Sequence, residues 1–529
     1  MAPAMRQDST PYGHDRMTHG RRSPGIPHSW IAFLAFTLVA PWTTSADAQT
    51  RAATKNPLAG FDQYVMAAMK QWKVPGLAIA AVRGDSVIML KGYGVRTVGG
   101  TDSVNAQTMF AIGSSSKAFT AATLEMLADE GRIRFDNRVT EYLPWFEMYD
   151  PWVTREITVR DLLLHRSGMS RGNNIWYATT NSREDIVRSI RRLAPTTSFR
   201  SHFQYQNLMY ITAGEVAHAV TGQSWDDLIK SRIFAPLRMT SSNTSVRELA
   251  GNPNVATPHA ELGGVVTAIP YRNIDNAGAA GSINSNAADM AQWLRLWINN
   301  GSFEGKRLLS EATVREATAS QFTVDDPDMI ARLMSPRFLG YGFGWFVEDF
   351  RGQRWVNHGG NIDGMAAMVG FLPESRIGMV ILTNMNQSDV TLPLMANAFD
   401  RLLGISPAKD YNAEYYAAEQ ADQARRRAAA KPPVKVEGTK PSLPLEAYAG
   451  TYTDSFMGTA TVRLDGGKLF IKYDKSAIVG ELEHFHFDSF VATMNDAIMG
   501  KMPVTFKIGT SGKVVAMQFP LASADWVKR

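Results

Sequence analysis

The sequence predicts an α/β (α+β) domain, in which an antiparallel sheet is flanked by helices and joined to a helical subdomain, followed by a small antiparallel β-barrel. The first domain is predicted because apolar strand-like runs occur near both of its ends and amphipathic helical patterns lie between them. The barrel is indicated by closely spaced strand-like runs near the carboxyl end, separated by glycine-containing turns. A chain of 529 residues is also too long for one ordinary core.

Residues 1–48 have the features of a secretory signal peptide. Two arginines precede an apolar run over 30–42, and a small-residue cleavage site ends at Ala48. The run is shorter than the roughly 20 apolar residues that cross a bilayer. We therefore expect cleavage near Ala48 and a periplasmic or secreted protein without stable membrane insertion, and the export route stays open.

The first folded domain is predicted over residues 49–404. Its strand-like runs lie at 77–82 and 86–91 near one end and at 366–372 and 377–384 near the other, and a short turn joins each pair. The helical patterns between them lie at 118–130, 158–164, 208–220 and 290–298. One sheet closed by both ends of the domain, beside a helical subdomain, is the simplest arrangement, and it predicts a cleft at their junction.

A linker over 405–441 and a small β-barrel over 442–529 complete the predicted organisation. The linker is rich in Ala, Arg, Lys and Pro. Between 424 and 440 it holds six basic residues and one acid, which together match the whole net charge of +5. The rest of the chain is near neutral, so no general basic surface for nucleic acid is expected. The barrel runs are 448–453, 459–464, 468–473, 485–493, 504–508 and 514–519.

A Ser-x-x-Lys motif begins at Ser114, at the head of a predicted helix. Residues three apart on a helix share a face, so the Lys117 amine is expected beside the Ser114 hydroxyl. A serine is a weak nucleophile until a base takes its proton, and a lysine of lowered pKa can be that base. The helix amino terminus adds positive potential for an oxyanion. A helix-capping serine is the alternative for Ser114 alone, and a second match at Ser406 is set aside because it lies in the linker with a proline inside it.

Tyr205 and Asn207 open another predicted helix. The phenol is a candidate proton relay to a leaving group, and the amide is a candidate substrate contact. A lysine ammonium nearby is expected to lower the pKa of the Tyr205 phenol. Tyr271 and Asn273 have the same spacing, but the helix after Tyr205 gives that phenol the more rigid mount.

His358, Gly360 and Asn361 precede the last hairpin of the domain. Consecutive glycines allow a substrate backbone to approach a strand closely, and the Asn361 backbone amide is a candidate oxyanion donor beside that of Ser114. A glycine turn with a surface histidine is the alternative for this segment alone. His165 suggests a triad with the serine, but we interpret it as structural and hydrogen-bonded at the end of its helix.

No cofactor and no metal site are expected. The chain has no cysteine, which excludes disulfides, thiolate metal ligands and a cysteine nucleophile. Its histidines lack metal-ligand spacing, and no glycine-rich phosphate loop is evident.

Taken together, these motifs resemble the serine β-lactamase and penicillin-binding-protein superfamily, in particular its class-C-like esterase and D-peptidase branch. The resemblance implies that Ser114 is acylated, that Lys117 and Tyr205 share the acid and base work, and that the backbone amides of Ser114 and Asn361 form the oxyanion hole. Residues 448–452 resemble the start of a lipocalin-like domain appended to some peptidases of this branch. The matching segments run in family order at 74–78, 91–94, 112–120, 162–168, 205–207, 277–285, 341–345 and 358–364.

One departure from the family pattern bears on the substrate. Penicillin-recognising members carry Lys-Thr-Gly where this chain has His358, Gly359 and Gly360, and histidine is mostly neutral at pH 7. Strong binding of a β-lactam carboxylate at this position is therefore not expected. Histidine here is common in esterases, D-amino-acid peptidases and amidases of the branch.

The sequence thus predicts an exported serine hydrolase that works through an acyl-enzyme on Ser114. A peptidase or amidase acting on small peptides, including D-amino-acid-containing ones, is the leading hypothesis. A carboxylesterase and a weak β-lactamase are the alternatives on the same machinery, and a ligand-binding receptor is the alternative outside enzymes. The sequence leaves open the natural substrate and the role of the barrel. It also leaves open whether Lys117 or Tyr205 is the principal base, and whether the protein forms a homo-oligomer.

Overall fold

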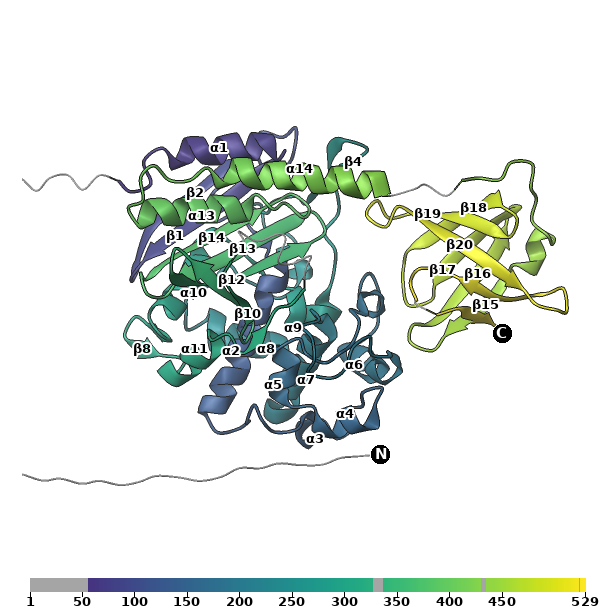
Figure 1. Ribbon diagram of the computed structural model, residues 1–529, viewed down its shortest axis with the longest axis horizontal. Helices are drawn as coiled ribbons and strands as arrows, with labels where there is room; N and C mark the ends of the chain where they lie inside the picture. Colours follow the sequence, from purple (N-terminus) through teal and green to yellow (C-terminus); the bar gives the residue numbers. More distant parts are fainter. Residues whose placement is uncertain (1–55, 327–335, 430–433, 523) are drawn as a thin grey trace, which may run out of the picture. The chain divides into compact units, whose positions relative to one another are not determined.

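The structure is a computed structural model that describes residues 56–326, 336–429, 434–522 and 524–529 (Figure 1). The predicted signal peptide over 1–48 lies outside these residues. Within them, no helix combines the length and the apolar character needed to cross a membrane.

An antiparallel sheet forms the centre of the first domain, as predicted, and it has eight strands, where the sequence pattern indicated four. The strands from its two ends meet where β1 pairs with β14, with Leu77 opposite Thr383. Both strands are buried along nearly their whole length, which explains their continuous apolar sequences. The strands in sheet order are β2 (Ser86–Gly94), β1 (Gly76–Arg83), β14 (Ile377–Thr383), β13 (Met365–Leu372), β12 (Gln353–Ile362), β11 (Phe346–Phe350), β10 (Leu339–Tyr341) and β9 (Phe322–Thr323).

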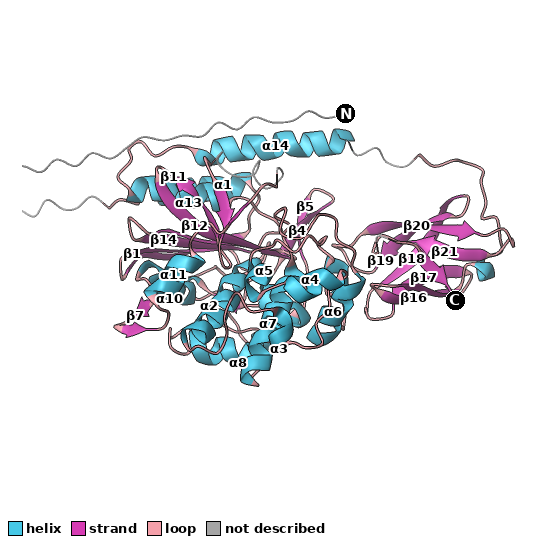
Figure 2. Ribbon diagram, turned by 60° about the horizontal axis from the view of Figure 1, so that its bottom comes forward, coloured by secondary structure: helices cyan, strands magenta, loops and turns pink. Residues whose placement is uncertain are grey.

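Helices cover both faces of this sheet (Figures 1 and 2). On one face α1 (Phe61–Gln71) and α13 (Thr391–Leu402) pack against the strands, and α14 (Tyr411–Ala429) packs against α13. On the other face lie α2 (Ser116–Asp129) and α10 (Ala287–Ile298). The Ser-x-x-Lys motif at the start of α2 is therefore placed between the sheet and the helical subdomain.

Several short helices of the helical subdomain begin with capping side chains. Thr158 and Asp161 form a capping box at the start of α5, and Ser182 and Asp185 form another at the start of α6. Asn286 caps α10 by accepting a hydrogen bond from the backbone amide of Asp289. The bounds of these and the other helices in the described part of this region are α3 (Val139–Tyr142), α4 (Pro151–Glu156), α5 (Val159–Leu163), α6 (Arg183–Ser189), α7 (Asn207–Thr221), α8 (Trp225–Ile229), α9 (Gly278–Gly281) and α11 (Glu311–Ala317).

The carboxyl-terminal strands close into an antiparallel barrel, as predicted. The structure adds two strands that the sequence pattern missed, β18 and β22. The predicted run 485–493 was misplaced because it spans the turn between β18 and β19. The strands are β15 (Gly450–Asp454), β16 (Gly458–Asp465), β17 (Lys468–Tyr473), β18 (Val479–His486), β19 (Ser489–Met494), β20 (Lys501–Ile508), β21 (Val514–Gln518) and β22 (Trp526–Lys528).

A buried carboxyl on β11 should make the stability of the fold depend on pH. Glu348 is 1% exposed and accepts a 2.7 Å hydrogen bond from Asn357. Burial raises the pKa of Glu348 from 4.5 to about 7, although the bond from Asn357 opposes this rise. Between these two pH values the folded state binds up to one proton more than the unfolded state. The contribution of Glu348 to stability is therefore fully present below pH 4.5 and is lost as the pH rises through about 7.

We expect this effect to remove roughly 3 kcal/mol of stability across that pH range. Glu348→Gln should flatten the dependence and raise the free energy of unfolding above pH 7, as measured by urea unfolding from pH 4.5 to 8. Glu374→Gln is the control, because Glu374 pairs with Arg354 at the surface. Equal pH dependence in the Glu348→Gln variant and the unsubstituted protein would contradict this expectation.

Candidate active site

Ser114 lies in a single 3-10 turn, Gly113–Ser115, that leads directly into α2. Strand β12 passes so close to this turn that a Cβ at Gly360 would lie 1.8 Å from the Ile112 carbonyl oxygen. Gly113 has a φ of +52°, and a Cβ there would lie 2.7 Å from the Asn361 backbone nitrogen. The glycines on both sides therefore allow strand and serine turn to touch, in addition to any role in admitting a substrate backbone.

The Lys117 amine is beside the Ser114 hydroxyl, as the spacing of the motif predicts. Its Nζ is 3.1 Å from Ser114 Oγ, 2.7 Å from Asn207 Oδ1 and 2.8 Å from the Ala280 carbonyl oxygen. The side chain is fully buried. Burial and, next, the charge of Arg171 lower the pKa of Lys117 well below its usual value of 10.5, which favours the neutral amine.

These contacts suit an amine that accepts a proton from the serine. A neutral amine has two N–H donors and one lone pair. The Asn207 and Ala280 oxygens can only accept, so they take the two donors, and the lone pair remains for the Ser114 hydroxyl. A protonated lysine has three N–H donors and no lone pair, so it could not accept the proton of the Ser114 hydroxyl.

Tyr205 lies immediately before α7 with its ring against the lysine. Lys117 Nζ is 4.8 Å from the ring centroid. The Tyr205 hydroxyl is buried and lacks a partner with normal hydrogen-bond geometry among the described residues. Burial raises the pKa of Tyr205, and interactions with the Ser114 hydroxyl and Arg171 oppose the rise. The sequence-based expectation of a lowered pKa was therefore wrong, because the loss of hydration outweighs the nearby positive charge.

Asn207 orients the lysine. Its Oδ1 accepts from Lys117, and its Nδ2 donates to Asn173 Oδ1 at 3.1 Å. Asn207 is the first residue of α7, which fixes the position of its side chain. A substrate contact by this amide stays a prediction, and it would use the second N–H of Nδ2.

His358 is buried within β12. The alternative interpretation of this segment, a glycine turn with a surface histidine, is therefore wrong. Its Nε2 lies 3.0 Å from the Tyr341 hydroxyl and its Nδ1 lies 2.6 Å from the Gly359 carbonyl oxygen. Burial and, next, the nearby Lys117 lower the pKa of His358 to about 3, so the ring is neutral at pH 7. The His358 carbonyl oxygen accepts from Ser115 Oγ at 3.0 Å, which links β12 to the serine turn.

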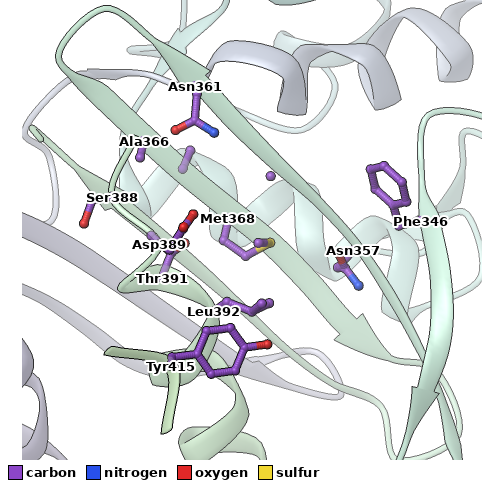
Figure 3. Close-up of a pocket in the computed structure, with 12 residues that line it drawn as sticks. Phe346, Asn357, Asn361, Ala366, Met368, Ser388, Asp389, Thr391, Leu392 and Tyr415 are labelled. Carbon is purple, nitrogen blue, oxygen red and sulfur yellow. The ribbon is translucent and has the colours of Figure 1, made fainter. Parts of the chain in front are cut away.

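Asn361 contributes its backbone, not its side chain, to the neighbourhood of Ser114. Side chains alternate along a strand, so those of Asn357 and Asn361 point to the opposite face from His358. There they line a cavity of about 200 Å³ with Met368, Leu392 and other side chains (Figure 3). This cavity lies across the sheet from the serine and is not the candidate catalytic site.

His165 supports the tyrosine segment from behind. It is fully buried, and its Nδ1 is 3.0 Å from the backbone nitrogen of Gln206. Its ring lies 4.3 Å from that of Tyr205, centroid to centroid. Burial is the main cause that lowers the pKa of His165 well below its usual value. These contacts fit the structural role that the sequence predicts.

The structure also brings together residues that sequence analysis did not single out. The Ala280 carbonyl, Asn173 and Tyr341 hold Lys117, Asn207 and His358 in place, and Arg171 lies beside Tyr205. Of these residues, only Ala280 and Tyr341 lie in segments that the sequence analysis had matched to the family, at 277–285 and 341–345. The competing Tyr271 donates its hydroxyl to the Ala256 carbonyl instead of reaching the serine. No group of three His, Cys, Asp or Glu suited to a metal occurs in the described ranges.

The sheet, its helices and the cluster at the start of α2 define a β-lactamase-like domain. The family model for beta-lactamase matches residues 61–398, so the chain belongs to this family, whose members are hydrolases. A second model, a domain of unknown function termed DUF3471, matches residues 434–527 and covers the barrel. The lipocalin-like resemblance of the barrel stays a prediction.

Two relatives illustrate the similarity in sequence. An unguisins hydrolase of Aspergillus violaceofuscus is 28% identical over 86% of this chain and 87% of its own length. Penicillin-binding protein 4 of Amycolatopsis lactamdurans is 30% identical over 63% of this chain and 85% of its own length. Both support the family assignment.

Solved structures show the same fold. The octameric penicillin-binding protein homologue from Pyrococcus abyssi covers 89% of this chain and 100% of its own, with a TM-score of 0.59 and 22% identity. A D-stereospecific amidohydrolase from Streptomyces covers 63% of this chain and 96% of its own, with a TM-score of 0.52 and 24% identity.

Proposed function

We propose that this protein is an exported serine hydrolase that cleaves amide bonds of small peptides, D-amino-acid-containing peptides among them, through an acyl-enzyme on Ser114. The observation that carries the proposal is the 3.1 Å contact between Ser114 Oγ and a buried Lys117 amine whose other partners are acceptors. The similarity to an unguisins hydrolase supports hydrolysis as the reaction. Export rests on the predicted signal peptide.

In the acylation step, Ser114 Oγ attacks the carbonyl carbon and its proton passes to the Lys117 amine. The carbonyl oxygen becomes an oxyanion, and the backbone amides of Ser114 and Asn361 are the donors proposed to stabilise it. The position of Ser114 at the amino end of α2 adds the favourable helix dipole.

Collapse of the tetrahedral intermediate breaks the C–N bond and needs a proton for the leaving nitrogen. Tyr205 is protonated at neutral pH because its pKa is raised, so it can donate this proton and recover one from the Lys117 ammonium. Water then attacks the ester on Ser114 while Lys117 takes its proton, and the Lys117 ammonium returns this proton to Ser114 Oγ as the bond between the acyl carbon and Oγ breaks. The products are an acid and an amine, and the enzyme returns to its initial state.

A carboxylesterase is the second candidate function, because the same groups would hydrolyse an ester. A β-lactamase is less favoured, since His358 is neutral and buried and offers no cation to a β-lactam carboxylate. Desolvation of the Lys117 amine beside a serine costs free energy. A ligand-binding receptor would have no need of this arrangement.

The test compares the purified protein on D-alanyl peptides, p-nitrophenyl esters and nitrocefin. We expect turnover of the peptides that depends on Ser114. Turnover of esters alone would overturn the peptidase proposal in favour of an esterase, and turnover of nitrocefin alone would favour a β-lactamase.

A further inference from the structure

Arg171 places a guanidinium beside the tyrosine of the candidate active site. Its Cζ is 5.2 Å from the centroid of the Tyr205 ring, and Lys117 Nζ is 4.8 Å from the same centroid. Lys117 is fully buried, whereas the Arg171 side chain is exposed. Arg171 is therefore accessible to an incoming substrate.

Arg171 forms no ion pair with an acid in the described part of the chain. Other arginines of the helical subdomain do. Arg166 and Arg200 both pair with the buried Asp161 at 2.6 Å, which makes them structural. An exposed arginine that stacks on a catalytic ring without an acidic partner is free to bind an anion from solution.

The charge of Arg171 acts on the reacting groups. It contributes to the lowered pKa of Lys117 and of His165, and it opposes the raised pKa of Tyr205. Lys117 and His358 both have strongly lowered pKa values, whereas arginine stays charged at any pH of interest. A negative group on the substrate would therefore meet its counter-charge at Arg171 and not at His358.

The place of Arg171 also indicates which part of the substrate it meets. In the proposed mechanism Tyr205 gives its proton to the leaving nitrogen, so a group next to the Tyr205 ring belongs to the leaving side. When a peptide is cut at its last bond, the leaving amino acid carries a free carboxylate one carbon beyond its α-carbon. That carboxylate stays close to the leaving nitrogen and hence close to Tyr205.

We propose that Arg171 forms an anion subsite that binds the free carboxylate of the leaving amino acid. This inference rests on the proposed function and narrows it to peptides cut at their carboxyl-terminal bond. A guanidinium binds a carboxylate through two parallel N–H···O bonds, which a lysine ammonium cannot reproduce.

The test uses one acylated D-alanyl-D-alanine peptide in two forms, with a free terminal carboxylate and with a terminal amide. Arg171→Gln is expected to lower kcat/KM for the carboxylate form by about 10- to 100-fold and to leave that for the amide form within about 3-fold. Arg171→Lys should recover part of the loss. Arg315→Gln, which removes a 71% exposed arginine of α11, is the matched control and should behave like the unsubstituted protein.

Each variant is compared on the pH plateau of its own rate profile, because loss of the Arg171 charge also raises the pKa of Lys117. Equal loss on both peptides would show that Arg171 acts only on Lys117 and Tyr205, and it would overturn the subsite. No loss on either peptide would overturn it as well.

Failure of the proposed function gives a different result. If only p-nitrophenyl esters are turned over, the peptidase proposal fails, and the two peptides are measured as competitive inhibitors of ester hydrolysis. Stronger inhibition by the carboxylate form that disappears in Arg171→Gln would still support the subsite. Equal inhibition by both forms, or none by either, would overturn it.

Discussion

Replacement of Ser114 with alanine is expected to lower kcat/KM on a D-alanyl peptide by about 10⁵-fold or more, because no other group takes over the covalent step. The fold should be retained, since Oγ is small and its hydrogen bond to Lys117 is a single contact. Residual hydrolysis is measured by product formation. Covalent labelling with a fluorophosphonate is measured by the mass of the intact protein.

A matched control comes from the second Ser-x-x-Lys sequence of the chain. Ser406→Ala changes a serine in the same four-residue pattern but outside the domain sheet, and it should keep full activity and labelling. Labelling that persists in Ser114→Ala would identify another nucleophile. An unsubstituted protein that takes up no label would support the receptor alternative.

The central sheet could be predicted because its strands β1, β13 and β14 are apolar along their length. Strand β12 could not, because its centre is His358, Gly359 and Gly360, a sequence typical of a turn. These residues are extended because β12 pairs with strands on both sides. Such long-range pairing leaves little trace in a local pattern, and the three-residue β22 that closes the barrel was missed for the same reason.

The contact between Ser114 and Lys117 could be predicted because it is local, set by residues three apart at a helix start. The approach of Tyr205 and the serine turn's contact with β12 depend on the packing of separate elements, and only the family resemblance indicated them. The pKa shifts of the site were the least predictable feature from sequence. The raised pKa of Tyr205 follows from burial under surrounding residues such as His165, which cannot be judged from sequence.

Lys117→Met is expected to lower kcat/KM by about 10³-fold at pH 7, within the usual range for loss of a general base. Methionine fills a similar volume without a proton acceptor. The pH dependence identifies the base. Activity needs the unprotonated amine, so it should fall as acid protonates Lys117, and the plateau should begin well below pH 10.5 because the pKa of Lys117 is lowered.

This acid limb should disappear in Lys117→Met and persist in Tyr205→Phe, with a smaller loss of rate in the second variant. The reverse pattern would follow if the Tyr205 phenolate were the base. Because burial raises the pKa of Tyr205, activity would then keep increasing at alkaline pH, and Tyr205→Phe would remove that increase. The profile of the two variants thus separates an amine that takes the serine proton from a phenol that passes it to the leaving group.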